Sequence, residues 1–171
     1  MLIVGVLVKT ADQFSDTWKN ENYIGVIFGV IYGLLLGYLM ATSEVMATIW
    51  VGILLALILK GKFNSISHLL GIGIIIMTII FMNDFSINFL LMLVYFIGSW
   101  LDESLNDLFD FKKMKNGIGK VIGFIAEYRL VTEIIAVSVA LVLGQPAYWF
   151  GLLSFDIGYQ ATTKIWTKFI A

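Results

Sequence analysis

The sequence contains no cysteine, which excludes disulfide bonds, thiolate metal ligands and cysteine nucleophiles. It has a single histidine, so a zinc site built from nitrogen or sulfur ligands lacks its usual donors. The local motifs typical of serine hydrolases, zinc proteases and P-loop proteins do not occur either. Any chemistry of this chain must therefore rest mainly on carboxylates, amines and hydroxyls.

Charge is also scarce. Only 13% of the 171 residues are charged and 60% are hydrophobic, which is far from the composition of an average soluble domain. Several apolar stretches approach the length of about 20 residues that a helix needs to cross a bilayer. No repeat or compositional break divides the chain. We therefore predict an all-α, polytopic helical membrane bundle that forms one domain over residues 1–171.

Apolar runs bounded by charge predict the positions of the crossings. Six are expected: Tyr23–Met40, Val45–Leu59, Ile66–Met82, Ile87–Leu101, Leu130–Leu143 and Tyr148–Thr163. The N-terminal stretch Leu2–Trp18 carries a polar stripe along one helical face. We expect it to be a further helix, either a seventh crossing or a re-entrant or interfacial helix.

The basic residues fall on alternate connections between these segments. The connections at Met40–Val45, Met82–Ile87 and Gly144–Pro146 contain no Lys or Arg, whereas ten basic residues share the other face. The positive-inside rule assigns the basic face to the cytoplasm. The predicted location is the cell membrane, with multiple crossings and cytoplasmic basic loops.

Four glycines recur at four-residue steps in the first predicted crossing: Gly25, Gly29, Gly33 and Gly37. Small residues at this spacing let two helix backbones approach closely in a membrane. The pattern has two interpretations, a helix packed tightly inside the chain or the seam of a homo-oligomer.

The stretch WLDESLNDLFDFKKMK places an unusual number of acids at the edge of a predicted crossing. At about 100° per residue its polar side chains share an arc of roughly 140°; they are Asp102, Glu103, Asn106, Asp107 and Asp110. Asp12 and Asp16 form a second acidic stripe near the N-terminus. Crowded carboxylates need a cation, a lysine partner or a raised pKa. We expect both stripes to line one cavity and to bind Mg²⁺ or another hard divalent cation. The alternative is a solvated helix end that neutralises nearby lysines.

Basic residues near the same boundary suit phosphate. Lys60, Lys62 and Lys112 are the predicted phosphate-binding residues, and the predicted catalytic residues are Asp107, Asp156, Glu127, Arg129 and His68. Arg129 is the only arginine, and its planar fork suits bidentate binding of phosphate or carboxylate. An ion pair with Glu133 one turn later is the equally weighted alternative. Asp156 lies deep in a predicted crossing, where an ionisable group is costly unless it is paired or functional.

These residues favour a membrane-embedded, cytoplasm-facing, metal-dependent enzyme acting on a phosphorylated or diphosphate lipid, by phosphoryl or prenyl transfer or by hydrolysis. The fragment NDLFDF, Asn106 to Phe111, resembles the start of the aspartate-rich motif of membrane prenyltransferases of the UbiA type. Met114 stands where those enzymes have a later aspartate, and the family is not carried over. The expected partner is a membrane lipid, and nothing points to nucleic acid. The alternatives are a cation- or proton-coupled transporter or channel, and a non-catalytic subunit of a membrane complex.

Overall fold

The structure is a computed structural model, and it describes residues 1–17, 23–108, 117, 121, 124, 125 and 129–170. In these residues every regular element is helical and no strand occurs, which confirms the all-α prediction. The seven helices are α1 (Leu2–Thr17), α2 (Tyr23–Thr42), α3 (Glu44–Leu59), α4 (Ile66–Met82), α5 (Phe89–Leu108), α7 (Leu130–Leu143) and α8 (Ala147–Ile170).

Local sequence explains where several helices begin and end. The Ser43 hydroxyl accepts a hydrogen bond from the Met46 amide at the start of α3, and Ser65 does the same for the His68 amide at the start of α4. Helix α7 ends at Gly144, whose φ of +64° is the left-handed conformation that glycine adopts without strain. Pro146 follows two residues later and prevents the helix from continuing. Short polar connections therefore reverse the chain between long apolar helices.

Only part of the predicted membrane architecture is supported by helix length. Helix α2, with 20 residues, is the one helix among the described residues that is long and apolar enough to cross a membrane. Helices α3, α4 and α7 are apolar but have 16, 17 and 14 residues. At 1.5 Å per residue they span about 21–26 Å, less than a hydrocarbon core of about 30 Å. Helices α5 and α8 are longer but carry charged residues.

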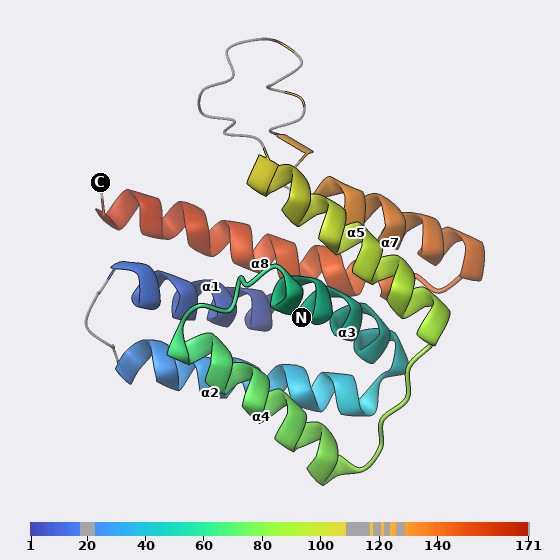
Figure 1. Cartoon of the computed structure of the whole chain (residues 1–171), viewed down its shortest axis with the longest axis horizontal. Helices are drawn as coiled ribbons and strands as arrows, with labels where there is room; N and C mark the ends of the chain where they lie inside the picture. The colour runs from blue at the N-terminus through green and yellow to red at the C-terminus, as the bar shows by residue number, and fades with distance from the viewer. Residues whose placement is uncertain (18–22, 109–116, 118–120, 122–123, 126–128, 171) are drawn as a thin grey trace.

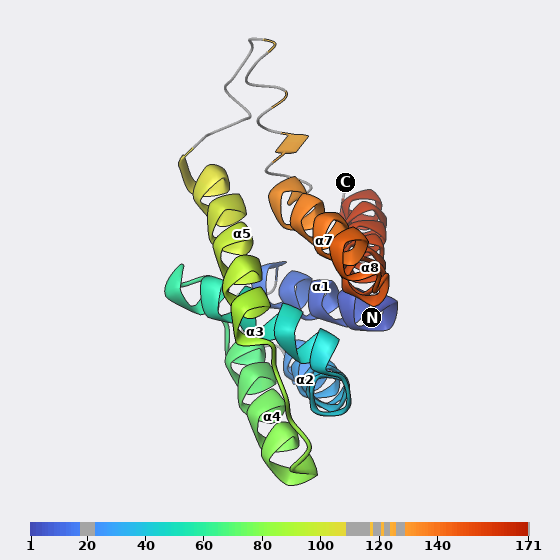
Figure 2. The same ribbon diagram turned by 90° about the vertical axis from the view of Figure 1, so that its right-hand side faces the viewer.

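The helices pack in pairs that are distant in sequence. Helix α2 packs against α4, α3 against α5, and α1 against α8, while α7 contacts both α5 and α8 (Figure 1). After a quarter turn, α4 and α5 lie along one side of the molecule and α7 and α8 along the other, with α1 between them (Figure 2). The acidic segment of α5 continues the helix beyond Leu101, so the predicted acidic face is helical as far as Leu108. Polar residues of several helices can therefore meet in the interior.

The glycine ladder of α2 packs inside the chain. A Cβ built on Gly33 would lie 2.7 Å from the carbonyl oxygen of Gly71 in α4, and one on Gly37 would lie 2.8 Å from Thr78 Cβ. A Cβ on Gly29 would overlap the carbonyl oxygen of Ser67, and Gly25 faces α1. The intramolecular interpretation thus accounts for all four glycines. The homo-oligomer stays a prediction that these contacts do not test.

Substitution of Gly29 by alanine is expected to lower the free energy of unfolding by about 1–3 kcal/mol, because the new methyl group meets backbone that cannot move aside cheaply. Gly73→Ala is the matched control. Its Cβ would meet nothing within 4 Å, and alanine is the better helix former by about 1 kcal/mol. Reversible unfolding in mild detergent measures both. Equal stability of the two variants would contradict the close α2–α4 packing.

Candidate functional site

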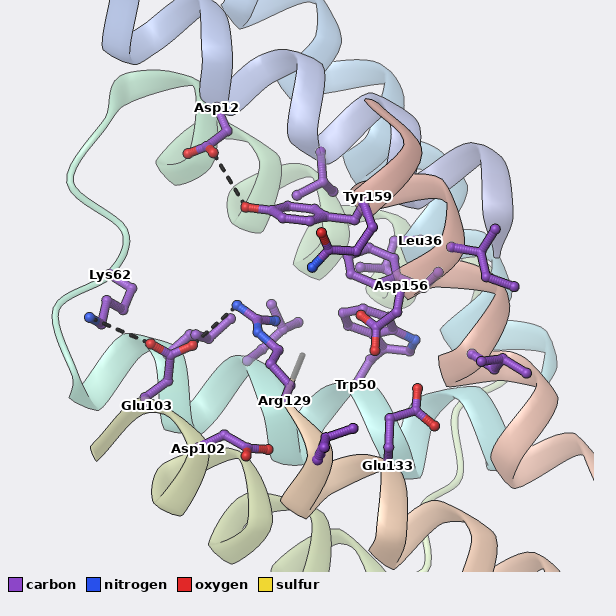
Figure 3. A pocket seen from close by; sticks show the side chains of 18 of the residues that line it. Asp12, Leu36, Trp50, Lys62, Asp102, Glu103, Arg129, Glu133, Asp156 and Tyr159 are labelled. Carbon is purple, nitrogen blue, oxygen red and sulfur yellow. Dashed lines mark hydrogen bonds and ion pairs between the residues drawn. The ribbon is translucent and has the colours of Figure 1, made fainter. Parts of the chain in front are cut away.

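One cavity of about 960 Å³ receives side chains from all seven helices (Figure 3). The structure places eight of the predicted site residues on its wall: Asp12, Lys62, His68, Asp102, Glu103, Asn106, Arg129 and Asp156. Lys60 and Asp107 are not among the lining residues. Glu127, Asp110 and Lys112 lie outside the described residues, as does the Asp16 side chain. The two acidic stripes therefore meet, through Asp12 on one side and Asp102 and Glu103 on the other.

A chain of charges occupies one part of this wall. Glu103 Oε1 accepts a hydrogen bond of 3.1 Å from Arg129 Nη2, and its other oxygen lies 3.5 Å from Lys62 Nζ. The Glu103 carboxylate is nearly buried, whereas both basic side chains are about one third exposed. Glu103 thus holds two cations at the cavity wall and leaves several of their N–H donors directed elsewhere.

Lys62 also reaches past the cavity to the end of α5. Its Nζ donates to Asp107 Oδ1 at 2.6 Å, and Lys60 Nζ lies 3.7 Å from the other oxygen of Asp107. The bond from Lys62 lowers the pKa of the Asp107 carboxyl and raises the pKa of the Lys62 amine. Lys60 in turn lies over the Trp100 ring. Asp107 is thus a partly exposed carboxylate bound by two lysines, and its predicted catalytic and metal role stays a prediction.

Asp102 fixes the start of α7. Its carboxylate accepts hydrogen bonds from the amide of Val131 at 3.1 Å, the amide of Thr132 at 2.8 Å and the Thr132 hydroxyl at 2.6 Å. These amides belong to the first turn of α7, which has no partner for them within the helix. Asp102 is only 2% exposed, and its carboxylate caps the helix, while its predicted role as a metal ligand stays a prediction.

Arg129 precedes α7 in an unusual backbone conformation. Its φ of +50° and ψ of +41° are left-handed, and a residue with a Cβ adopts this region at some cost. The Asp102 cap on the two following amides and the Glu103 ion pair hold Arg129 in place. The predicted alternative, an ion pair with Glu133, is absent from the described contacts. A strained backbone that aims the only guanidinium at a cavity is typical of a functional site.

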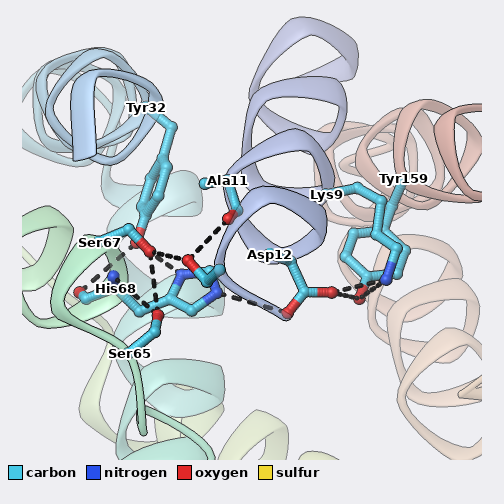
Figure 4. A network of polar contacts seen from close by, with 9 residues as sticks. Lys9, Ala11, Asp12, Tyr32, Ser65, Ser67, His68 and Tyr159 are labelled. Carbon is cyan, nitrogen blue, oxygen red and sulfur yellow. Dashed lines mark hydrogen bonds and ion pairs between the residues drawn. The ribbon is translucent and has the colours of Figure 1, made fainter. Parts of the chain in front are cut away.

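A second polar network joins α1, α2, α4 and α8 around Asp12 (Figure 4). Lys9 Nζ donates to Asp12 Oδ2 at 2.5 Å, and the Tyr159 hydroxyl donates to the same oxygen at 3.4 Å. On the other side, His68 Nε2 lies 3.6 Å from Asp12 Oδ1, and His68 Nδ1 lies 3.1 Å from the Tyr32 hydroxyl. His68 is thus oriented from both ring nitrogens, by a carboxylate and by a phenol.

Glu133 and Asp156 form the third polar group of the cavity. They lie on α7 and α8 as electrostatic neighbours that both line the cavity, and the Trp149 indole donates to Glu133 Oε2 at 3.1 Å. Two buried carboxylates repel unless a proton or another cation lies between them. Asp156, predicted as a functional residue from its depth in the sequence, thus has Glu133 as an acidic neighbour, and Arg129 also acts on its charge.

The predicted metal cluster does not assemble in the part of the chain that the structure describes, where no three carboxylate or histidine side chains are arranged to hold an ion. The physical reason is pairing. Asp102 is bound by amides, while Glu103, Asp107 and Asp12 each face lysine, arginine or histidine. The magnesium cofactor stays a prediction.

Much of the remaining wall is apolar and reaches the outer surface. Leu36, Leu57 and Ile75 line the interior, whereas Ile134 and Ile157 line the same cavity and are more than half exposed. One cavity thus joins a charged region to an apolar wall that is continuous with the outside of the bundle.

Sequence reasoning missed the aromatic and hydroxyl groups of the site. Tyr32, Trp50, Trp149 and Tyr159 line the cavity, and three of them bond to its charged residues. The one available signal is Tyr32, which lies in the glycine ladder among residues that pack inward. Trp149 and Tyr159 resemble any other aromatic residue of an apolar helix.

Comparison of the chain with protein-family models, with characterised proteins and with solved structures found no match.

Proposed function

We propose that this is a multi-pass membrane protein that binds a phosphorylated or diphosphate lipid in its cavity and catalyses transfer or hydrolysis at the head group from the cytoplasmic side. The observation that carries the proposal is the single cavity in which Lys62, Arg129 and His68 meet an apolar wall. An amphiphile with a phosphate at one end needs these two surfaces side by side.

The outer surface supports placement in a membrane. Helices α4 and α7 carry large apolar side chains that are fully open to the surroundings, among them Phe81 at 88% and Val142 at 83% exposed. Large apolar side chains exposed in this number are unusual on a soluble monomer. The shorter helices cross the bilayer if it thins around them or if flanking residues reach its polar surfaces.

The charged region supports phosphate chemistry. Arg129 and Lys62 are held by Glu103 with donors to spare, and His68 is oriented by Asp12 and Tyr32. Preorganised cations stabilise negative charge that develops on phosphate oxygens, with little rearrangement during the reaction. In the proposal Mg²⁺ accompanies the phosphate as a cofactor, and removal of Mg²⁺ from the assay tests this part separately.

The proposal is tested with purified protein in lipid nanodiscs, supplied with a polyprenyl phosphate or diphosphate, with and without Mg²⁺. We expect release of phosphate or diphosphate, or transfer to an added lipid alcohol. Val137→Trp fills the cavity and should lower turnover at least about tenfold, because small displacements of a substrate already cost this much. Val142→Trp adds the same side chain on the outer surface of α7 and should leave turnover unchanged. Absence of any lipid-phosphate reaction, or equal loss in both variants, would contradict the proposal.

A cation- or proton-coupled transporter is the second candidate. The observation that favours it is the pair Glu133 and Asp156, each of which has one buried oxygen, since intramembrane carboxylates frequently lie on ion pathways. Ion or proton flux into proteoliposomes tests it. Flux that Asp156→Asn abolishes, without lipid-phosphate turnover in the wild type, would select the transporter over the enzyme.

A further inference from the structure

Three buried polar atoms in the cavity wall have no hydrogen-bond partner among the described residues. They are Glu133 Oε1, Asp156 Oδ2 and Trp50 Nε1. All three side chains line the same cavity, and Figure 3 places Trp50, Glu133 and Asp156 around one part of it. Trp50 is only 4% exposed, and its ring packs edge-on against Phe155, the residue before Asp156. Buried polar groups are nearly always paired, so three orphans at one place point to a missing ligand.

The chemistry of the three atoms restricts what that ligand is. An indole N–H only donates, whereas a carboxylate oxygen only accepts. An ammonium group would satisfy the carboxyl groups and leave Trp50 without an acceptor. A phosphate would accept from Trp50 and be repelled by the carboxyl groups. A hydroxyl group accepts from Trp50 and donates its one proton to a carboxyl oxygen, and a proton held by the carboxyl pair itself fills the remaining place.

We propose that Trp50, Glu133 and Asp156 form a binding site for a hydroxyl group, which accepts from Trp50 Nε1 and donates to the carboxyl pair. The apolar wall beside it, with Leu153, Ile134 and Ile157, suits a long-chain alcohol, and water is the other source of the same group. The alcohol or water bound here is the acceptor substrate of the proposed enzyme, so this inference rests on the proposed function.

The acceptor role follows from the carboxyl pair. As the hydroxyl oxygen forms a bond to the electrophilic phosphorus or prenyl carbon, its O–H bond breaks and the proton passes to Glu133 or Asp156. The leaving group departs with the electron pair of its own bond to that centre. A carboxylate that accepts the hydrogen bond before the reaction is already within reach of this proton. Transfer results when the hydroxyl belongs to an alcohol, and hydrolysis when it belongs to water.

The test measures binding of the alcohol alone, without any phosphorylated lipid. Protein in nanodiscs is titrated with a long-chain prenol, with its methyl ether and with the matching hydrocarbon, and tryptophan fluorescence and thermal stability are followed. The ether accepts a hydrogen bond but does not donate one. We expect the prenol to bind at least about tenfold more tightly than the ether, because the ether leaves a buried acceptor unpaired.

Two variants and two matched controls complete the experiment. Asp156→Asn should remove the preference for the alcohol over the ether. Trp50→Phe should weaken the binding of both the prenol and the ether relative to the hydrocarbon, because both oxygens accept from the indole. Asp107→Asn and Trp100→Phe make the same chemical changes at residues that do not line the cavity and should change neither result. If Asp156→Asn fails to fold, Trp50→Phe carries the test through the comparison of the prenol and the ether with the hydrocarbon.

Equal binding of prenol and ether by the wild type would overturn the alcohol site and leave water as the occupant. An alcohol preference that survives Asp156→Asn, or binding of the prenol and the ether that Trp50→Phe leaves unchanged, would overturn the assignment of these residues. If only the proposed function is wrong, the wild type still prefers the alcohol over the ether but turns over no phosphorylated lipid.

Discussion

Replacement of Asp102 by alanine is expected to lower the free energy of unfolding by about 3 kcal/mol or more. The substitution removes three hydrogen bonds at once and leaves the amides of Val131 and Thr132 buried without a partner. A lost hydrogen bond to a charged group costs about 1.5–3 kcal/mol, and a buried donor left unpaired keeps its full desolvation penalty. Equilibrium unfolding in mild detergent measures the effect.

Asp107→Ala is the matched control on the same helix. The Asp107 side chain is 43% exposed and its partners are lysines, so its loss should cost less than about 1 kcal/mol. Asp102→Ala should also lower helix content by circular dichroism, because the first turn of α7 loses its cap. The comparison of these two variants, five residues apart on one helix, thus distinguishes a carboxylate that stabilises the fold from one that lies at the surface. Similar stability of both variants would contradict the cap.

The pattern of the sequence predicted which residues share a helix face, and it did so because helical periodicity is a local property. The acidic face of α5 and the polar stripe of α1 are both present, and Asp12 and Glu103 line the same cavity. The pattern could not predict that Asp102, adjacent to Glu103 in sequence, turns to the amides of α7. That choice depends on how α5 and α7 cross, which is a long-range property.

The partners of the charged residues were predicted less well than their positions. Proximity in sequence suggested Glu133 for Arg129, whereas the structure pairs Arg129 with Glu103, 26 residues earlier. Depth in an apolar run drew attention to Asp156, but no local signal identified Glu133 as its neighbour. A carboxylate selects its partner by three-dimensional packing, and the acids that suggested a metal cluster are instead distributed among separate basic groups and amides.

Arg129→Lys is expected to lower turnover of the phosphorylated lipid about 100-fold, which is typical for the loss of one preorganised donor to a developing oxyanion. Lysine keeps the positive charge opposite Glu103 and has the same cost at a φ of +50°, so the stability of the fold should change little. What lysine cannot supply is the planar pair of N–H groups that binds two phosphate oxygens together.

Lys60→Arg is the complementary control, since Lys60 contacts Asp107 and Trp100 and does not line the cavity. It exchanges the same two side chains in the opposite direction and should leave turnover unchanged. Steady-state rates of both variants, measured alongside their melting temperatures, separate catalysis from folding. If Arg129→Lys reacts as fast as the wild type, the guanidinium is only a partner of Glu103, and phosphate must be bound elsewhere in the cavity. A loss of turnover confined to Arg129→Lys would instead mean that the strained N-terminus of α7 exists to present this one side chain to the substrate.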